Sequence, residues 1–156
     1  MNIRLIVVGK TKALYLTEGI KDYIQRLKRY GKVEMVEVKG VPERSSQNKG
    51  YVLDKEAERI FSKIEKGTFL IVLERTGRLL SSEELSEFFR SYLDRGIRGW
   101  TFVIGGPLGI APAVIEKADL VLSISKMTFT HDMARLILLE QIYRAMTISA
   151  GVPYHK

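Results

Sequence analysis

The sequence contains no cysteine and only two histidines, His131 and His155. The lack of cysteine excludes disulfides, thiolate metal sites and cysteine nucleophiles, and it suits a cytoplasmic protein. The histidines lack the spacing of a zinc site, so we expect no metal. No apolar stretch approaches the ~18 residues that a membrane span needs. The short apolar N-terminus ends in Gly9-Lys10 without a cleavage site, so we expect neither a signal peptide nor a membrane segment.

The charge of the chain is strongly basic. Its 25 Lys and Arg residues outnumber 18 Asp and Glu residues, which gives a net charge of +7 and a pI near 9.6. Most of this excess falls within residues 1–65. A basic balance favours a polyanionic partner such as nucleic acid. The length of 156 residues predicts a single domain over residues 1–156.

Hydrophobic periodicity predicts strands that alternate with helices along the whole chain. We expect strands over residues 3–8, 33–38, 68–73, 101–104 and 120–124. We expect helices over 16–27, 53–64, 113–117 and 132–149, and one that begins at Ser81 or Ser82. Thr11 or Thr17 is a candidate start for the first helix, and residues 74–78 have the composition of a turn. This order implies an α/β fold with a mostly parallel sheet and helices on both faces.

A glycine-rich loop, Gly105-Gly106-Pro107-Leu108-Gly109, follows the predicted strand that ends at Ile104. Ligands of open α/β sheets bind beyond the carboxyl ends of the strands, and glycine allows backbone to approach a ligand closely. The loop has neither the dinucleotide-binding spacing nor that of a P-loop. It therefore either binds a ligand or forms a tight strand-to-helix turn.

Two further features lie near the C-terminus. His131 and Arg135 are four residues apart and share one face of the last predicted helix. Such an arginine could bind a phosphate or carboxylate; alternatively, His131 lies at the helix cap and Arg135 is solvated. Glu140 and Arg144 repeat the spacing and could form an intrahelical pair. The tail containing Pro153-Tyr154-His155 is expected to fray unless it docks on its own chain or on a partner.

Together these features resemble the ribosomal large-subunit methyltransferase H family of the SPOUT superfamily over the whole chain. The stretches that carry the resemblance are Ile3–Gly9, Leu53–Glu56, Ile104–Gly109, Leu122–Arg135, Glu140–Ala145 and Pro153–His155. The sequence departs from the family pattern at two places. Leu108 stands where the family often has an acidic residue, and Gly151-Val152 stands where it tends to have Asn-His.

The resemblance implies a homodimeric, S-adenosylmethionine-dependent methyltransferase of the cytoplasm with a C-terminal trefoil knot. It implies methylation of N3 of a pseudouridine in 23S ribosomal RNA on assembled ribosomes. By position, the cofactor pocket should be formed by Leu73, Ile104, Gly105, Gly106, Pro107, Gly109, Ser123, Ile124, Ser125, Lys126, Met127 and Thr128. The candidate catalytic residues are His131, Arg135, Tyr154 and His155.

The chemistry of these side chains suggests a role for each. A neutral histidine could accept the N3 proton, an arginine could stabilise the anionic ring, and Tyr154 could stack on the target base. The candidates for RNA phosphate contacts are Lys21, Arg26, Lys28, Arg29, Arg44 and Lys49, each of which could equally belong to a solvated face. The alternatives are a non-catalytic RNA- or ribosome-binding protein on the same fold, and a flavodoxin-like or nucleotide-binding enzyme.

Overall fold

The computed structural model describes residues 1–42 and 48–154. Within these residues five strands and five helices alternate along the chain. In order they are β1 (Asn2–Val8), α1 (Leu14–Leu27), β2 (Lys32–Val38), α2 (Lys49–Phe61), β3 (Phe69–Leu79), α3 (Ser82–Asp94), β4 (Gly99–Ile104), α4 (Pro112–Glu116), β5 (Leu120–Ser123) and α5 (His131–Ser149). None of the helices in this described part is long and apolar enough to cross a membrane.

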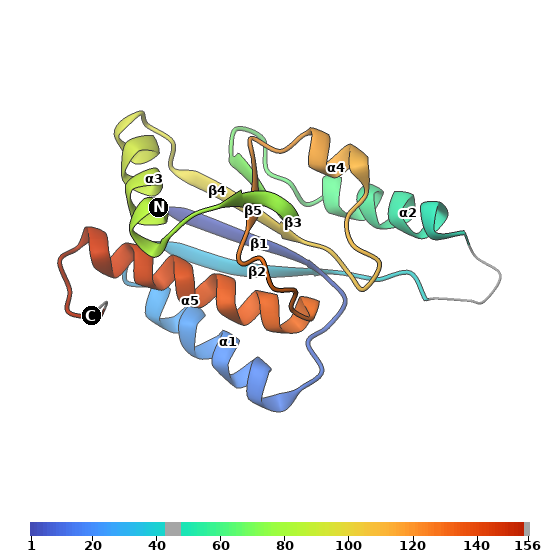
Figure 1. Cartoon of the computed structure of the whole chain (residues 1–156), viewed down its shortest axis with the longest axis horizontal. Coiled ribbons are helices and arrows are strands. Elements are labelled where there is room, and N and C mark those ends of the chain that lie inside the picture. Colours follow the sequence, from blue (N-terminus) through green and yellow to red (C-terminus); the bar gives the residue numbers. More distant parts are fainter. Residues whose placement is uncertain (43–47, 155–156) are drawn as a thin grey trace.

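The strands form one sheet in the order β2-β1-β4-β3-β5, and every described pair is parallel. Helices α1, α3 and α5 cover one face and α2 and α4 cover the other, so the sheet lies between two helical layers (Figure 1). A sheet covered on both faces needs apolar side chains on both, which is why residues 5–8 of β1 form a continuous apolar run. The predicted parallel α/β fold is confirmed.

Successive residues of β1 face opposite cores. Leu5 and Val7 belong to the larger core under α1, α3 and α5, which includes Trp100, and Ile6 packs in the core under α2 and α4. Phe89 of α3 meets Trp100 edge to face, with ring centroids 4.9 Å apart. This aromatic packing fixes α3 against β4 through buried apolar area.

The ends of the helices follow local side-chain chemistry, but not always as predicted. Ser81 and Glu84 form a capping box at the start of α3, which confirms that prediction. Helix α1 starts after Ala13, which makes no side-chain cap, so the prediction that Thr11 or Thr17 opens it is wrong. Thr17 instead donates a hydrogen bond from Oγ1 to the Ala13 carbonyl.

The predicted turn at residues 74–78 is also wrong, because β3 continues to Leu79. Leu73 and Arg78 both align with Leu122 of β5, so the intervening residues form a long irregularity in the pairing. Gly77 lies directly against the β5 backbone. A Cβ atom there would come within 2.7 Å of the Leu122 carbonyl carbon and 2.8 Å of that of Val121. Only glycine allows β3 to pass this close to β5.

We therefore expect Gly77→Ala to destabilise the fold, because the new methyl group would displace backbone rather than a mobile side chain. The expected loss is about 1–3 kcal/mol in the free energy of unfolding, the usual cost of overpacking. Urea unfolding would measure it. Gly50→Ala is the matched control, because a Cβ at this exposed helical position meets no atom closer than 3.5 Å. Equal stability of both variants and the wild type would contradict the close approach.

Candidate active site

A pocket of about 520 Å³ lies where β4 and β5 end and where the regular pairing of β3 with β5 breaks off after Leu73. Its walls come from three stretches of chain: residues 73–75 within β3, residues 104–110 after β4, and residues 122–134 from β5 into α5. This volume is within the ~300–1,000 Å³ typical of small-molecule sites. The position agrees with the rule that ligands of parallel sheets bind beyond the carboxyl ends of the strands.

The glycine loop forms one wall with its backbone. A Cβ at Gly105 would lie 2.3 Å from the Gly109 carbonyl oxygen, and Gly109 has a φ of +95°. The Gly109 N–H donates to the Gly106 carbonyl at 3.0 Å, which closes the loop on itself. Behind it, the buried carboxylate of Glu56 accepts a hydrogen bond from the Val41 N–H at 3.1 Å. The loop is therefore a compact turn and a pocket wall at once.

The opposite wall is held by short-range hydrogen bonds. Ser123 donates from Oγ to the Ser125 carbonyl at 3.0 Å, and the Ser125 Oγ accepts from the Met127 N–H at 3.0 Å. Thr130 then caps α5 by accepting from the Met133 N–H at 3.3 Å. Every residue predicted to contact the cofactor lines this pocket except Lys126, which is exposed.

Several lining residues were not predicted, among them Glu74, Arg75, Leu108 and Phe129. The first two were missed because their segment has the composition of a turn. Leu108 was recognised only as a departure from the family pattern. Glu74 accepts hydrogen bonds from the Thr76 hydroxyl at 2.6 Å and from its N–H at 2.5 Å. These two bonds hold the pKa of Glu74 below its ordinary value, so the pocket has an anionic carboxylate at neutral pH.

Of the two candidate catalytic residues His131 and Arg135, only His131 lines the pocket. His131 lines the pocket, with its Nε2 3.3 Å from Asp132 Oδ1. Arg135 is fully buried and does not line it. Its guanidinium donates to the Val8 carbonyl at 2.6 Å and to Thr11 Oγ1 at 2.8 Å, and it lies 3.0 Å from Asp132 Oδ1. The alternative that Arg135 is solvated is wrong. The arginine joins the end of β1 to the start of α5.

Burial lowers the pKa of Arg135, while the carboxylates of Asp132 and Glu37 act in the opposite direction. Arg135→Met would remove the buried cation and its ion pair with Asp132. We expect a loss of about 3–5 kcal/mol in the free energy of unfolding, as for other broken buried pairs. Urea unfolding of the variant would measure the loss, with exposed Arg29→Met as the control. A variant that unfolds like the wild type would contradict this structural role.

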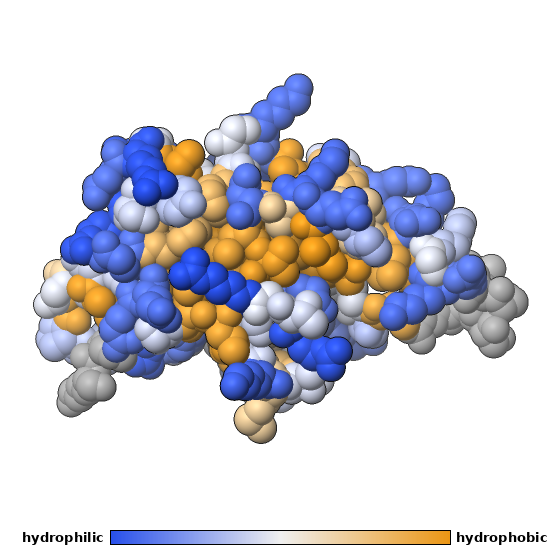
Figure 2. All heavy atoms as spheres, turned by 45° about the horizontal axis from the view of Figure 1, so that its top comes forward, coloured by the Kyte–Doolittle hydropathy of each residue, from blue (hydrophilic) through white to orange (hydrophobic). Residues whose placement is uncertain are grey.

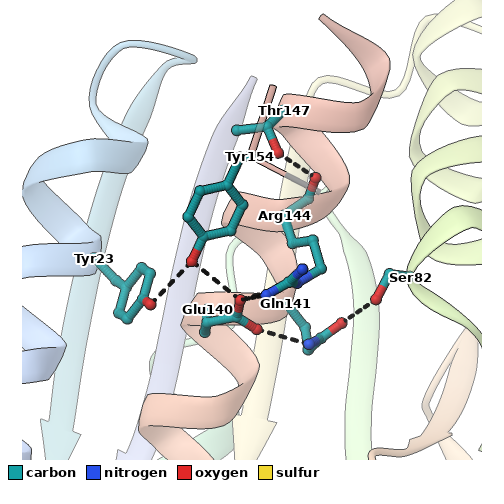
Figure 3. A network of polar contacts seen from close by, with 7 residues as sticks. All are labelled: Tyr23, Ser82, Glu140, Gln141, Arg144, Thr147 and Tyr154. Atoms are coloured by element: carbon teal, nitrogen blue, oxygen red, sulfur yellow. Dashed lines mark hydrogen bonds and ion pairs between the residues drawn. The ribbon is translucent and has the colours of Figure 1, made fainter. Parts of the chain in front are cut away.

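The C-terminal tail docks on its own chain through Tyr154 (Figure 3). The Tyr154 hydroxyl donates to Glu140 Oε1 at 3.2 Å and lies 3.1 Å from the Tyr23 hydroxyl. Because its proton goes to the carboxylate, Tyr23 must donate to Tyr154. The Tyr154 ring packs against Tyr143, and the predicted pair between Arg144 and Glu140 is confirmed at 2.6 Å. The prediction that the tail frays is therefore wrong up to residue 154. His155 lies outside the described residues.

Burial, the Tyr23 hydroxyl and the Glu140 carboxylate raise the pKa of Tyr154 above its ordinary value of 10.0. The folded state thus favours the neutral phenol, and its contribution to stability is fully present below about pH 10. It should be lost progressively as the pH rises from there toward the pKa of the folded state. We expect the free energy of unfolding of Tyr154→Phe to fall less steeply above pH 10 than that of the wild type. Exposed Tyr51→Phe serves as the control, and parallel curves for all three proteins would contradict the docking.

The docked Tyr154 and the pocket contact different parts of α5. The helix begins at His131 beside the pocket, and Tyr154 packs against Tyr143, roughly 18 Å farther along at about 1.5 Å per residue. In Figure 1 the segment that follows α5 lies at the end of the helix remote from its start. The structure therefore does not bring Tyr154 together with His131 within one chain.

The predicted RNA-binding residues also lie in different parts of the molecule. Lys21 and Arg26 are exposed on α1, and Lys28 and Arg29 are exposed in the turn that follows it. The Arg26 guanidinium lies over the Tyr23 ring, 5.7 Å from its centroid, so this set is on the side of the tail. Lys49 is exposed at the start of α2, and Arg44 lies outside the described residues. Among the residues with described positions, no group of three or more histidines and carboxylates could hold a metal ion.

The fold and pocket define a class of protein: a parallel α/β domain with a pocket of small-molecule size between backbone-rich loops. Residues 1–155 match the family described as "Predicted SPOUT methyltransferase". The chain is 46% identical to the Acetivibrio thermocellus "Ribosomal RNA large subunit methyltransferase H" over 159 aligned residues, which cover 100% of both chains. The Desulfotalea psychrophila protein of the same name is 42% identical over 158, again with 100% of both covered. The chain belongs to the SPOUT methyltransferase family and, within it, to the ribosomal large-subunit methyltransferase H group.

Solved structures show likeness of fold at much lower identity. A probable methylase family protein from Haemophilus influenzae aligns with a TM-score of 0.55 and 16% identity, covering 99% of this chain and 70% of that one. A probable methyltransferase from Bordetella pertussis has the same TM-score and identity, and the match covers 93% of this chain and 96% of that one. These two similarities concern the fold alone.

Proposed function

We propose that this protein transfers the methyl group of S-adenosylmethionine to N3 of a pseudouridine in 23S ribosomal RNA on assembled ribosomes. The observation that carries the proposal is the pocket where β4 and β5 end and the regular pairing of β3 breaks off, in a chain of this family. The trefoil knot and the homodimer that the resemblance implies are part of the same proposal.

The lining of the pocket fits this cofactor. Leu73, Ile104 and Ile124 offer apolar surface to an adenine ring, and the glycine loop offers backbone donors and acceptors. The Glu74 carboxylate suits a ligand that carries positive charge. The cofactor supplies an already activated methyl group, so the main task of the chain is to position the two reactants.

The proton on N3 needs an acceptor. His131 is the candidate that lines the pocket, and a neutral imidazole can accept a proton near pH 7. Tyr154 has a raised pKa and stays protonated, which suits stacking or hydrogen bonding rather than proton removal. His155 remains a second candidate base. We assign Arg135 a positioning role, because its guanidinium is buried and hydrogen-bonded to Val8 and Thr11.

The separation along α5 argues that each active site takes its tail from a second copy of the chain. Arg26, an exposed basic residue of α1, lies over Tyr23, whose hydroxyl contacts Tyr154, so it would accompany the tail to the pocket of the partner. Figure 2 shows apolar side chains across the middle of one face of the molecule, a kind of surface that often marks an interface. These observations support a homodimer with composite sites.

The direct test is methyl transfer from labelled S-adenosylmethionine to ribosomes that lack the modification. We expect label on N3 of one large-subunit pseudouridine after digestion, and much less with Gly105→Ala, whose new Cβ would collide with the loop. If the protein binds the cofactor but does not label the ribosomes, its substrate must be sought among other RNAs. If it neither binds the cofactor nor labels the ribosomes, the alternative of a non-catalytic RNA- or ribosome-binding protein is favoured.

Mixing two inactive variants tests the composite site. His131→Ala should disable the pocket side, and a chain ending at Val152 should lack the tail. If the tail acts across the dimer, a mixed dimer has one intact site, and random exchange should restore about a quarter of wild-type activity. Each variant must sediment as the wild type does. Mixtures that form mixed dimers but stay inactive would place the tail and the pocket of one chain in the same site.

A further inference from the structure

The pocket edge of the sheet is rich in lysine and arginine. In the parallel register, Val8 aligns with Val38, Val7 with Ile104, and Leu73 with Leu122. The segments that follow β1, β2, β5 and the paired part of β3 therefore leave the sheet at one edge. These segments contain exposed basic side chains, which we call the strand-end rim: Lys10, Lys12, Lys39, Arg75 and Lys126.

Few acidic side chains at this edge are available to neutralise the rim. Glu74 is hydrogen-bonded to Thr76, Asp132 is beside Arg135, and Glu56 is buried. Glu37 is exposed on β2. Within residues 1–42 and 48–154, no ion pair shorter than 4.0 Å joins a rim side chain to a carboxylate. The rim therefore presents positive charge that the described chain leaves largely uncompensated.

Arg135 holds part of this rim beside the pocket. It binds the Val8 carbonyl and Thr11 Oγ1, while the Lys12 N–H donates to Asp132 Oδ2 at 3.4 Å. These contacts tie the segment containing Lys10 and Lys12 to the start of α5, where His131 lines the pocket. The buried pair thus places two lysines near the proposed reaction centre without neutralising them.

Exposed aromatic rings accompany the rim. Tyr15, at the start of α1, is 66% exposed, and Phe129, which lines the pocket, is 43% exposed. Aromatic rings next to a basic surface are typical of proteins that bind unpaired RNA, because bases stack on the rings while cations contact the phosphates. Charge and aromatic surface therefore favour the same partner here.

We propose that the strand-end rim binds the backbone phosphates of the RNA around the target nucleotide, with Tyr15 and Phe129 against neighbouring bases. The inference rests on the proposed function and adds to it the surface that receives the substrate on the pocket side. The rim is distinct from the basic residues in and just after α1 (Lys21, Arg26, Lys28 and Arg29), of which Arg26 lies over Tyr23 on the side of the tail.

The test is the double variant Lys10→Gln/Lys12→Gln, measured for binding to assembled ribosomes that lack the modification. We expect at least a roughly tenfold weaker affinity near 0.1 M salt, and a log–log salt slope smaller by about 1.5, because each lost phosphate contact removes about 0.7–0.9. Affinity for S-adenosylmethionine, measured by calorimetry, should not change. Lys63→Gln/Lys66→Gln is the matched control, because both lysines are exposed and follow α2, at the opposite edge of the sheet.

The outcomes separate the rim from the proposed function. Unchanged ribosome affinity and salt slope in the double variant would refute the rim, as would an equal effect in the control. A double variant that sediments as a monomer would also refute it, because the surface would then join two copies of the chain. A wild-type protein that binds no assembled ribosomes would refute the proposed substrate itself, whichever variant is compared with it.

Discussion

Because every described strand pair is parallel, the carboxyl ends of the strands meet at one edge of the sheet. The chain must leave that edge and return to the other side before each new strand, so several connections crowd into the same space. Close crossings there demand residues without side chains. Gly77 lies against the β5 backbone, and Gly105 lies against Gly109. The pocket is the space between these connections, which explains why so much of its wall is backbone.

The length of α5 is a second constraint, and it acts on function. One end of this 19-residue helix borders the pocket, whereas Tyr154 docks farther along it, at Glu140 and Tyr143. A rigid helix cannot bring these positions to its start, so pocket and tail cannot meet in one chain unless the tail leaves Glu140 and Tyr23. Docking makes such release costly, because it would leave the Glu140 carboxylate and the Tyr23 hydroxyl without their partner. In a dimer, the docked tail of one chain can lie at the pocket of the other without leaving Glu140 and Tyr23.

Sequence periodicity was sufficient to predict the order of strands and helices, the parallel sheet and the position of the pocket, because these depend on local apolar patterns. It failed where distant backbone decides the structure. Residues 74–79 have polar, turn-like side chains, yet pairing with β5 extends them into a strand. The partners of Arg135 are 124 and 127 residues away, and Tyr23 is 131 residues from Tyr154. No pattern within a helix indicates such contacts, so the sequence left Arg135 between a ligand site and a solvated face.

The position of Arg135 also bears on how a single small domain can recognise RNA. A fully buried guanidinium has a desolvation cost, which the Asp132 carboxylate and two further hydrogen bonds offset. The same contacts anchor the segment after β1 to the first turn of α5. If the arginine were exposed, its charge would contribute to RNA binding, but Lys10 and Lys12 would lose their fixed position. A buried cation that orders two exposed cations thus favours defined phosphate contacts over diffuse attraction, and placing them beside His131 would link RNA binding to methyl transfer.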